Sequence, residues 1–355
     1  MILIIAEKAI AGRRIATILA GQQLQGNATG KAMHFDFEQQ GKQYMVVPLR
    51  GHIVDVDFPP RYSHWIGTDL RKLVGSEIEY RETERMIAGL LKKIAPDIEQ
   101  VIIATDADTE GESIGLEAVD ILKSTNPKIE VKRMRFSAII EKDIRDAFSS
   151  LGELDYNLAD SANARREVDL IWGAVLTRFL SLISGQLGKQ FLSIGRVQGP
   201  TLALIVDREK QRQAFRSKPY WLLEAEFEKD KARFTALHNE GKFWEKEKAE
   251  KAMQCRGSKL GIVLSVKKSK RVLRKPVPFN TTLFLRAATA IGFTAGRAMQ
   301  VAENLYQQGL ISYPRTDNSV YPPSLDLGAI LNRLLAVGKF SQLVGQLLRA
   351  GTMQP

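Results

Sequence analysis

A short apolar run that leads into four acidic residues constrains the possible fold more than any other segment of this chain. Residues 101–105 read Val-Ile-Ile-Ala-Thr, and the acids Asp106, Asp108, Glu110 and Glu112 follow within seven residues. The β-branched run predicts a buried strand, and the acids after it predict a turn. The pattern of residues 114–122 predicts a helix. Because ligands bind beyond the carboxyl ends of the strands in an open α/β sheet, this turn is a candidate ligand site.

Four carboxylates this close together repel one another, so a fold retains them where positive charge compensates. Mg²⁺ is the candidate, because this hard cation prefers carboxylate oxygens as ligands. The alternative is a solvated acidic turn at a helix N-terminus, where carboxylates interact favourably with the helix dipole. A buried strand that runs directly into D-x-D-x-E-G-E favours the metal site.

The composition indicates a globular protein of several domains with a polyanionic partner. A chain of 355 residues is too long for one ordinary core. Its net charge of +11 favours nucleic acid as the partner. The single cysteine, Cys255, excludes an internal disulfide and a cysteine-cluster zinc site. Since neither a membrane span nor a signal peptide is recognisable, we predict a cytoplasmic protein without a membrane partner.

The first part of the chain alternates short apolar strands with helical patterns. Strands are expected at residues 2–6, 44–49, 101–105 and 131–136, with a helix at 9–19. This alternation predicts a parallel sheet covered by helices. Glu7 and Lys8 follow the first strand as Asp106 and Asp108 follow a later one. If the two strands are neighbours, Glu7 joins the acidic cluster and Lys8 lies beside it.

The remainder of the chain changes its pattern three times. Residues 141–215 are helical, with one helix at 157–182 and another beginning after 193–200. Residues 220–272 alternate again and predict antiparallel strands in WLLEAEFE, ARFTALH and GIVLSVKK. Helices at 280–290 and 295–308, ended by Gly309 and followed by an extended 310–313, predict a winged helix-turn-helix. Residues 322–355 form one amphipathic helical region.

Tyr313 and Arg315 are two residues apart in a predicted extended stretch, so both side chains can face the same side. A phenol is a poor nucleophile until it is deprotonated. A neighbouring guanidinium helps by stabilising the phenolate and the charge that develops on a phosphate. Such a pair is usually structural when it occurs alone. Together with the acidic turn and the basic chain, it suggests phosphoryl transfer to tyrosine.

Six segments of the sequence, here called blocks, resemble the type IA DNA topoisomerases. Their residues look most similar to the archaeal branch of that family. The blocks occur in the family's order and are LIIAEK…RRIA, IIATDADTEGESIG, FSAIIEKDI, NLADSANARREVDLIWG, SIGRVQGPTLALIVDRE and LYQQGLISYPRTD. The second block is similar to the Toprim acidic motif. The resemblance covers nearly the whole chain.

The resemblance implies a multidomain α/β and α+β fold. Residues 1–150 would form a Toprim domain with a Rossmann-like parallel sheet. The first part of a helical single-strand-binding domain would follow at 151–217, and the first part of a small β-rich arch domain at 218–278. Residues 279–355 would belong to an incomplete helix-turn-helix-like domain that carries the catalytic tyrosine.

The resemblance also assigns the site residues. Tyr313 would form a 5′-phosphotyrosine bond, Arg315 would hold the scissile phosphate, and Asp106, Asp108 and Glu110 would bind Mg²⁺. Glu7 would be the acid/base near the leaving 3′ oxygen, Lys8 a phosphate stabiliser, and Glu112 a supporting group behind the ligands. Arg165, Arg166, Asp169, Arg196 and Gln198 would line the path of a single DNA strand. Without the family, Arg165 and Arg166 could equally be charges on a helix surface.

The implied function is ATP-independent relaxation of negatively supercoiled DNA by a monomer in the nucleoid. Walker A, the motif of ATP-driven gyration, is absent, and Thr109 stands where many members have arginine. None of the residues after Tyr313 matches the family's later histidine motif, and His34, His52, His64 and His238 lie upstream in unrelated contexts. We therefore expect an N-terminal fragment with impaired activity.

Two other functions stay open. One is a non-catalytic fragment that binds single-stranded DNA. The other is a different Toprim enzyme, a primase or nuclease, against which the block ISYPRTD argues.

Overall fold

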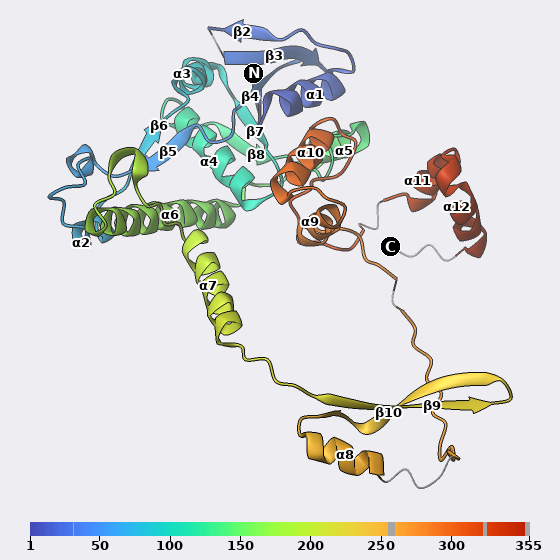
Figure 1. Ribbon diagram of the computed structural model, residues 1–355. Coiled ribbons are helices and arrows are strands. Elements are labelled where there is room, and N and C mark those ends of the chain that lie inside the picture. Colours follow the sequence, from blue (N-terminus) through green and yellow to red (C-terminus); the bar gives the residue numbers. More distant parts are fainter. Residues whose placement is uncertain (31, 255–259, 274, 322–324, 352–355) are drawn as a thin grey trace. The chain divides into compact units, whose positions relative to one another are not determined.

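The computed structural model describes residues 1–30, 32–254, 260–273, 275–321 and 325–351. The chain divides into two units, one made of Met1–Arg196 with Pro276–Pro355 and the other of Val197–Lys275 (Figure 1). None of the helices that the structure describes has both the length and the apolar composition needed to cross a bilayer.

A mixed sheet of six strands forms the centre of the first unit. Its order is β2 (Asn27–Thr29), β3 (Ala32–Gln39), β4 (Lys42–Pro48), β1 (Ile2–Ala6), β7 (Gln100–Ala104) and β8 (Glu130–Arg133). β1 is parallel to both β4 and β7, and β7 is parallel to β8, whereas β2 and β3 pair antiparallel. The predicted parallel sheet is thus confirmed, with an antiparallel edge.

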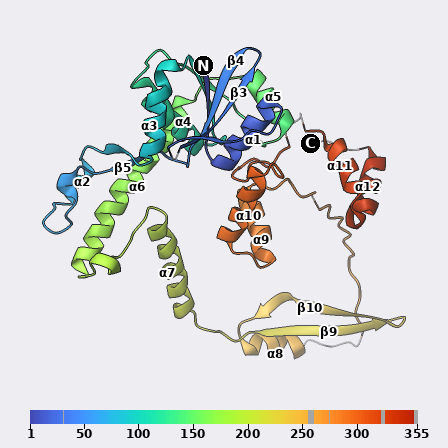
Figure 2. The same cartoon turned by 90° about the horizontal axis from the view of Figure 1, so that it is seen from above.

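Helices cover both faces of this sheet, which explains why its central strands are apolar throughout (Figure 2). Successive strand residues point to opposite faces. Leu3 and Ile5 of β1 pack with α3 (Arg85–Ile94) and α4 (Thr109–Lys123). Ile4 and Ala6 pack with α1 (Ala9–Ala20) and α5 (Glu141–Ser149). Two separate hydrophobic cores therefore hold the strand ends in place.

The acidic segment differs from the prediction in one respect. Helix α4 begins at Thr109, with Asp108 as its N-cap, five residues before the predicted start. Glu110 and Glu112 therefore lie in the first helical turn and not in a preceding turn. The helix begins early because the Asp108 side chain accepts a hydrogen bond from Gly111 N at 2.7 Å, which is a capping interaction that the apolar pattern does not register.

A small two-stranded sheet and a long helix complete the first part of this unit. β5 (Val54–Asp57) pairs antiparallel with β6 (Glu79–Glu82), and η1 (Pro60–Tyr62) and α2 (Arg71–Val74) lie between them in the chain. The short helix η2 (Ala95–Asp97) directly follows α3. The long helix α6 (Tyr156–Ile183) packs along α4, and η3 (Gly188–Gln190) comes next in the chain. The predicted helix at 157–182 is confirmed.

The end of the first unit contains two helical pairs. α9 (Thr281–Ala290) and α10 (Ala295–Gln307) form the predicted helix-turn-helix. Residues 310–313 form no strand, because their described backbone bonds go to Leu305 O and Ser137 O and to no strand partner, so the predicted wing strand is wrong. The predicted helical region at 322–355 contains two helices, α11 (Leu327–Leu335) and α12 (Gly338–Ala350). The rest of that prediction, 322–324 and 352–355, lies outside the described residues.

The second unit contains α7 (Gln198–Ala214), β9 (Trp221–Lys229), β10 (Ala232–Phe243) and α8 (Lys246–Gln254). β9 and β10 pair antiparallel, as predicted. The third predicted strand, GIVLSVKK, is wrong, since residues 261–268 have no regular secondary structure. Its apolar alternation needs a sheet face to bury it, and Ile262, Leu264 and Val266 are instead more than four-fifths exposed. The proposed domain boundaries stay predictions.

Candidate active site

A cavity of about 160 Å³ lies in the first unit, at the carboxyl ends of β1 and β7. All seven residues that the sequence assigned to catalysis or to metal binding line this cavity: Glu7, Lys8, Asp106, Asp108, Glu110, Tyr313 and Arg315. Glu303, Tyr306 and Gln307 of α10 also line it. Residues up to 308 positions apart in the sequence therefore face one space.

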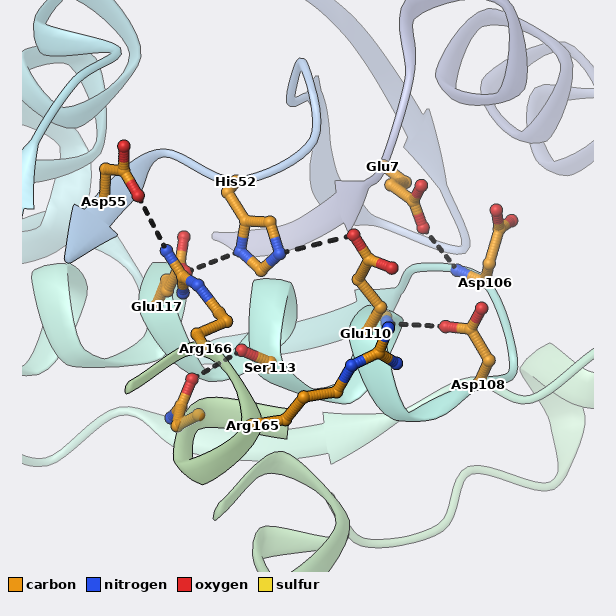
Figure 3. Close-up of polar contacts among 12 residues, drawn as sticks. Glu7, His52, Asp55, Asp106, Asp108, Glu110, Ser113, Glu117, Arg165 and Arg166 are labelled. Atoms are coloured by element: carbon orange, nitrogen blue, oxygen red, sulfur yellow. Dashed lines mark hydrogen bonds and ion pairs between the residues drawn. The ribbon is translucent and has the colours of Figure 1, made fainter. Parts of the chain in front are cut away.

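The pairing of β1 with β7 brings Glu7 to the acidic motif. Ala6 and Ala104 are partners in the register, so the residues that follow them leave the sheet side by side. Glu7 Oε2 accepts a hydrogen bond from Asp106 N at 3.2 Å (Figure 3). Lys8 Nζ lies 3.3 Å from Glu7 Oε1. The expectation that Glu7 and Lys8 join the acids is confirmed.

Two tyrosines from the end of the first unit contact the acids directly. Tyr306 donates a hydrogen bond to Asp106 Oδ1 at 3.0 Å, and the Tyr313 hydroxyl donates to Asp108 Oδ2. Their rings meet edge to face with centroids 5.1 Å apart. Tyr313 N also donates to Ser137 O at 2.9 Å, which anchors the backbone of the 310–313 segment. The tyrosine hydroxyl is thus held at the acidic turn.

The cavity concentrates negative charge. Burial, and then Glu7, raise the pKa of Asp106 to about 7. Burial and a hydrogen bond to Asp108 raise the pKa of Tyr313 well above its ordinary value. Both shifts have the same origin, because each group would add a negative charge to a buried and already acidic place. A positive charge in the cavity would lower both pKa values.

The donor set suits a hard divalent cation. Carboxylate oxygens are the ligands that Mg²⁺ prefers, and the Asp106 carboxylate is buried at the cavity wall close to Glu7. Asp106, Asp108 and Glu110 would supply those oxygens. Within the described ranges, however, no three histidine, cysteine, aspartate or glutamate side chains are grouped as a metal site. Asp108 now uses its oxygens to accept from Gly111 N and from Tyr313.

Glu112 has the supporting position that was expected of it. It is buried and forms an ion pair with Arg133, whose Nε lies 2.9 Å from Glu112 Oε1. Arg133 also donates to the carbonyl oxygens of Thr105 and Asp106 at 3.0 and 2.8 Å. The sequence interpretation missed Arg133, although an arginine within a predicted buried strand is a recognisable signal.

Arg315 is held by a residue that the sequence interpretation also missed. Its Nε donates to Glu303 Oε1 at 2.9 Å and its Nη2 donates to the same oxygen. The hydrogen bond from Arg315 to Glu303 raises the pKa of the guanidinium. Glu303 lies on α10, ten residues before Tyr313, and no local pattern marks it.

His52 lies at the edge of the acidic site, contrary to the expectation from the sequence. It was placed in an unrelated context, yet its Nδ1 lies 2.7 Å from Glu117 Oε1 and its Nε2 3.5 Å from Glu110 Oε1 (Figure 3). The signal was present, because His52 follows the predicted strand at 44–49 and the carboxyl ends of parallel strands share one edge.

The residues that were expected to line the path of a single DNA strand lie in three different environments. Arg165 Nε is 3.9 Å from Asp169, and Arg196 Nε is 2.6 Å from the same carboxylate, so these three lie together. Arg166 is mostly buried and donates to Glu117 at 2.5 Å and to Val54 O at 2.6 Å, so it is not a free surface charge. Gln198 is exposed at the start of α7, in the second unit.

Two family models match this chain. A family model described as DNA topoisomerase matches residues 153–353, which is more than half of the chain, and a Toprim domain model matches residues 2–139. The chain belongs to the type IA DNA topoisomerases. The acidic motif of this topoisomerase chain lies in the Toprim match, and Tyr313 lies in the other.

Individual relatives support the assignment. The chain is 46% identical to DNA topoisomerase 1 of Thermoplasma acidophilum, over 94% of this chain and 43% of that protein. It is 45% identical to DNA topoisomerase 1 of Archaeoglobus fulgidus, over 94% of this chain and 49% of that protein. The solved structure of topoisomerase I from Thermotoga maritima aligns with a TM-score of 0.64 at 26% identity, over 95% of this chain and 52% of that one. The chain thus spans about half the length of these relatives.

Proposed function

We propose that this protein cleaves and reseals one strand of DNA through a covalent bond to Tyr313, without ATP. The observation that carries the proposal is the contact of the Tyr313 hydroxyl with Asp108, in a cavity that also holds Lys8 and Arg315. A nucleophile, a proton acceptor and two cations suited to a phosphate therefore share one space. Toprim domains generally bind divalent metal ions, and we propose Mg²⁺ here.

In the proposed step, Tyr313 Oη attacks the phosphorus of a phosphodiester. The bond from phosphorus to the 3′ oxygen breaks, and the 5′ phosphate remains on Tyr313. The phenol proton passes to Asp108, which already accepts its hydrogen bond. Glu7 enters this step in its protonated form and gives its proton to the leaving 3′ oxygen, so that one proton is taken up and one is released. Arg315 and Lys8 stabilise the charge on the phosphate. Religation runs through the same groups in reverse.

Metal binding at Asp106, Asp108 and Glu110 would supply the positive charge that lets a phosphate enter this acidic cavity. The net charge of +11 supports DNA as the partner, and Arg165, Asp169 and Arg196 are proposed to hold a single strand along α6. Arg166 and Gln198 are proposed to contact the same strand because the family resemblance assigns them to its path. Because the Arg166 guanidinium is already engaged by Glu117, we expect it to contribute less to binding. The proposed substrate is the unpaired segment of negatively supercoiled DNA, bound by a monomer.

A covalent trapping assay tests this proposal. The protein is incubated with a 3′-labelled single-stranded oligonucleotide and Mg²⁺, then denatured, and label is expected on the protein. Tyr313→Phe should abolish the adduct because it lacks the nucleophilic oxygen. Tyr321→Phe, an exposed tyrosine eight residues further on, is the matched control and should keep it.

Three results would contradict the mechanism. These are the absence of any adduct, an adduct that survives Tyr313→Phe, and an adduct lost in Tyr321→Phe. A wild-type chain that binds the oligonucleotide without forming an adduct would instead support the function of a non-catalytic single-strand-binding protein.

A further inference from the structure

Glu117 is a buried carboxylate close to the proposed cation ligands. It lies on α4, two helical turns beyond Glu110, and is 6% exposed. Its Oε1 accepts from His52 Nδ1 at 2.7 Å and from Arg166 Nη1 at 2.5 Å. Its Oε2 accepts from the backbone N–H groups of Ile53 and Val54 at 2.9 and 3.0 Å. Both oxygens are thus fully used, which makes Glu117 a fixed anchor.

The anchor determines where His52 points. Because one ring nitrogen is bound to Glu117, the other can be presented in only one direction. Figure 3 shows the ring between the two carboxylates, with Nε2 directed at Glu110 Oε1, 3.5 Å away. His52 therefore spans two turns of the same helix and reaches from the anchor to the acidic cluster.

Glu110 needs such a partner. Its side chain is 57% exposed and sits on the first turn of α4. In the part of the chain that the structure describes, His52 is the only basic side chain within ion-pair distance of its carboxylate. Without a contact, an exposed glutamate samples several rotamers, and fixing one of them costs conformational entropy when a cation binds. Carboxylates that bind a metal are commonly held in place by hydrogen bonds from residues behind them.

We propose that His52 is a positioning residue, which Glu117 holds in place so that it keeps Glu110 oriented for divalent-cation binding. The inference rests on the proposed function, since it takes Glu110 as a ligand. Arg166 contributes indirectly, because its bonds to Glu117 and Val54 O keep the anchor and the 52–54 backbone together. His52 touches neither substrate nor reacting atoms in this assignment.

Direct Mn²⁺ binding to the full chain, measured from the free-ion EPR signal without DNA, tests the proposal. His52→Ala should raise the Mn²⁺ dissociation constant by about 10- to 100-fold. His52→Gln should recover part of the affinity, because its amide nitrogen replaces Nε2, which faces Glu110. His52→Asn, whose amide replaces Nδ1, should recover less. His64→Ala removes an exposed histidine between β5 and β6 and should bind Mn²⁺ as the wild type does.

If His52 had a purely structural role, the Mn²⁺ affinity of His52→Gln would not exceed that of His52→Asn. Thermal unfolding of each metal-free variant shows whether it is folded before its affinity is compared. The proposal is overturned if folded His52→Ala binds Mn²⁺ like the wild type, or if His52→Asn recovers more affinity than His52→Gln. If the adduct to Tyr313 forms normally in the wild type while His52→Ala leaves Mn²⁺ affinity unchanged, the proposed function stands and this inference fails. If the wild type binds no Mn²⁺, both the metal assignment and the inference fail.

Discussion

A single buried arginine organises the carboxyl end of the sheet. Arg133 has no exposed surface, and besides Glu112 it donates to four carbonyl oxygens, including those of Ile103, Thr105 and Asp106. Three of these carbonyls belong to the end of β7 and to the acidic segment after it, and the fourth is that of Met134. Arg133 thus satisfies backbone groups that leave the sheet, and it neutralises a buried carboxylate behind the site.

Removing Arg133 should therefore be severe. Arg133→Met keeps much of the volume but leaves Glu112 buried and several carbonyls without donors, so the free energy of unfolding should fall by about 3–5 kcal/mol. Arg135→Met removes a half-exposed partner of the same carboxylate and should cost less than about 1 kcal/mol. Urea unfolding of both variants checks this, and a loss of similar size in the two would refute the special role of Arg133.

The junction of β7 with α4 depends on glycine for close approach. A Cβ atom on Gly111 would lie 2.1 Å from the carbonyl oxygen of Asp106, and one on Gly115 would lie 2.5 Å from Ile103 Cγ2. The first contact is with backbone, which cannot move aside without moving Asp106 itself. The glycine of D-x-D-x-E-G-E thus lets the helix begin immediately after the strand, with its acids facing the cavity.

A pair of glycine substitutions tests this account of the junction. Gly111→Ala should lower the free energy of unfolding by roughly 2 kcal/mol or more, since Asp106 must shift, and should reduce Tyr313 adduct formation. Gly89→Ala, in the middle of α3 with open space around its Cβ, should instead stabilise by about 0.5–1 kcal/mol. Thermal unfolding measures both. Equal shifts of the same sign would show that the close approach to Asp106 has no energetic effect.

The chain is positively charged overall, whereas its cavity is lined mainly by acidic side chains. The chain carries a net charge of +11, whereas the cavity places Glu7, Asp106, Asp108, Glu110 and Glu303 against Lys8 and Arg315. The overall positive charge attracts a nucleic acid, but the local negative charge repels its phosphate. The same local charge destabilises the metal-free fold, because a buried carboxylate has to be accommodated without a cation.

The stability of the whole molecule should therefore depend on pH through Asp106. Its pKa is about 7 in the folded protein and near its ordinary value of 3.8 in the unfolded chain. Between these values the folded state binds a proton that the unfolded state has lost, so the free energy of unfolding falls as the pH rises and then levels off.

Asp106→Asn should remove this dependence. In EDTA the variant should be more stable than the wild type by roughly 1–3 kcal/mol at about pH 8, with a smaller difference near pH 4. Denaturant unfolding across this range checks the prediction. Parallel pH profiles for the two proteins would show that Asp106 does not carry a raised pKa.

Local pattern alone determined much of the site. The apolar runs of β1 and β7 predicted strands, and the rule that ligands bind at the carboxyl ends of strands marked Glu7 and the acids after β7 as site candidates, although only the pairing of β1 with β7 showed that they meet. The tyrosine and arginine of the ISYPRTD block were marked by their chemistry and by the family's motif. The helix at 157–182 followed from its periodicity. These features depend on residues that are close in the sequence, so composition and spacing reveal them.

Only the tertiary structure decided which distant residues meet. Placing β1 between β4 and β7 brings His52 to the acidic edge, and the contact of α10 with the sheet brings Tyr306 and Glu303 into the cavity. The same reason explains the failure of GIVLSVKK and of the wing strand, because a strand exists only where a second strand accepts its hydrogen bonds. Alternation specifies which side chains could be buried together, whereas pairing and long-range packing select the partners.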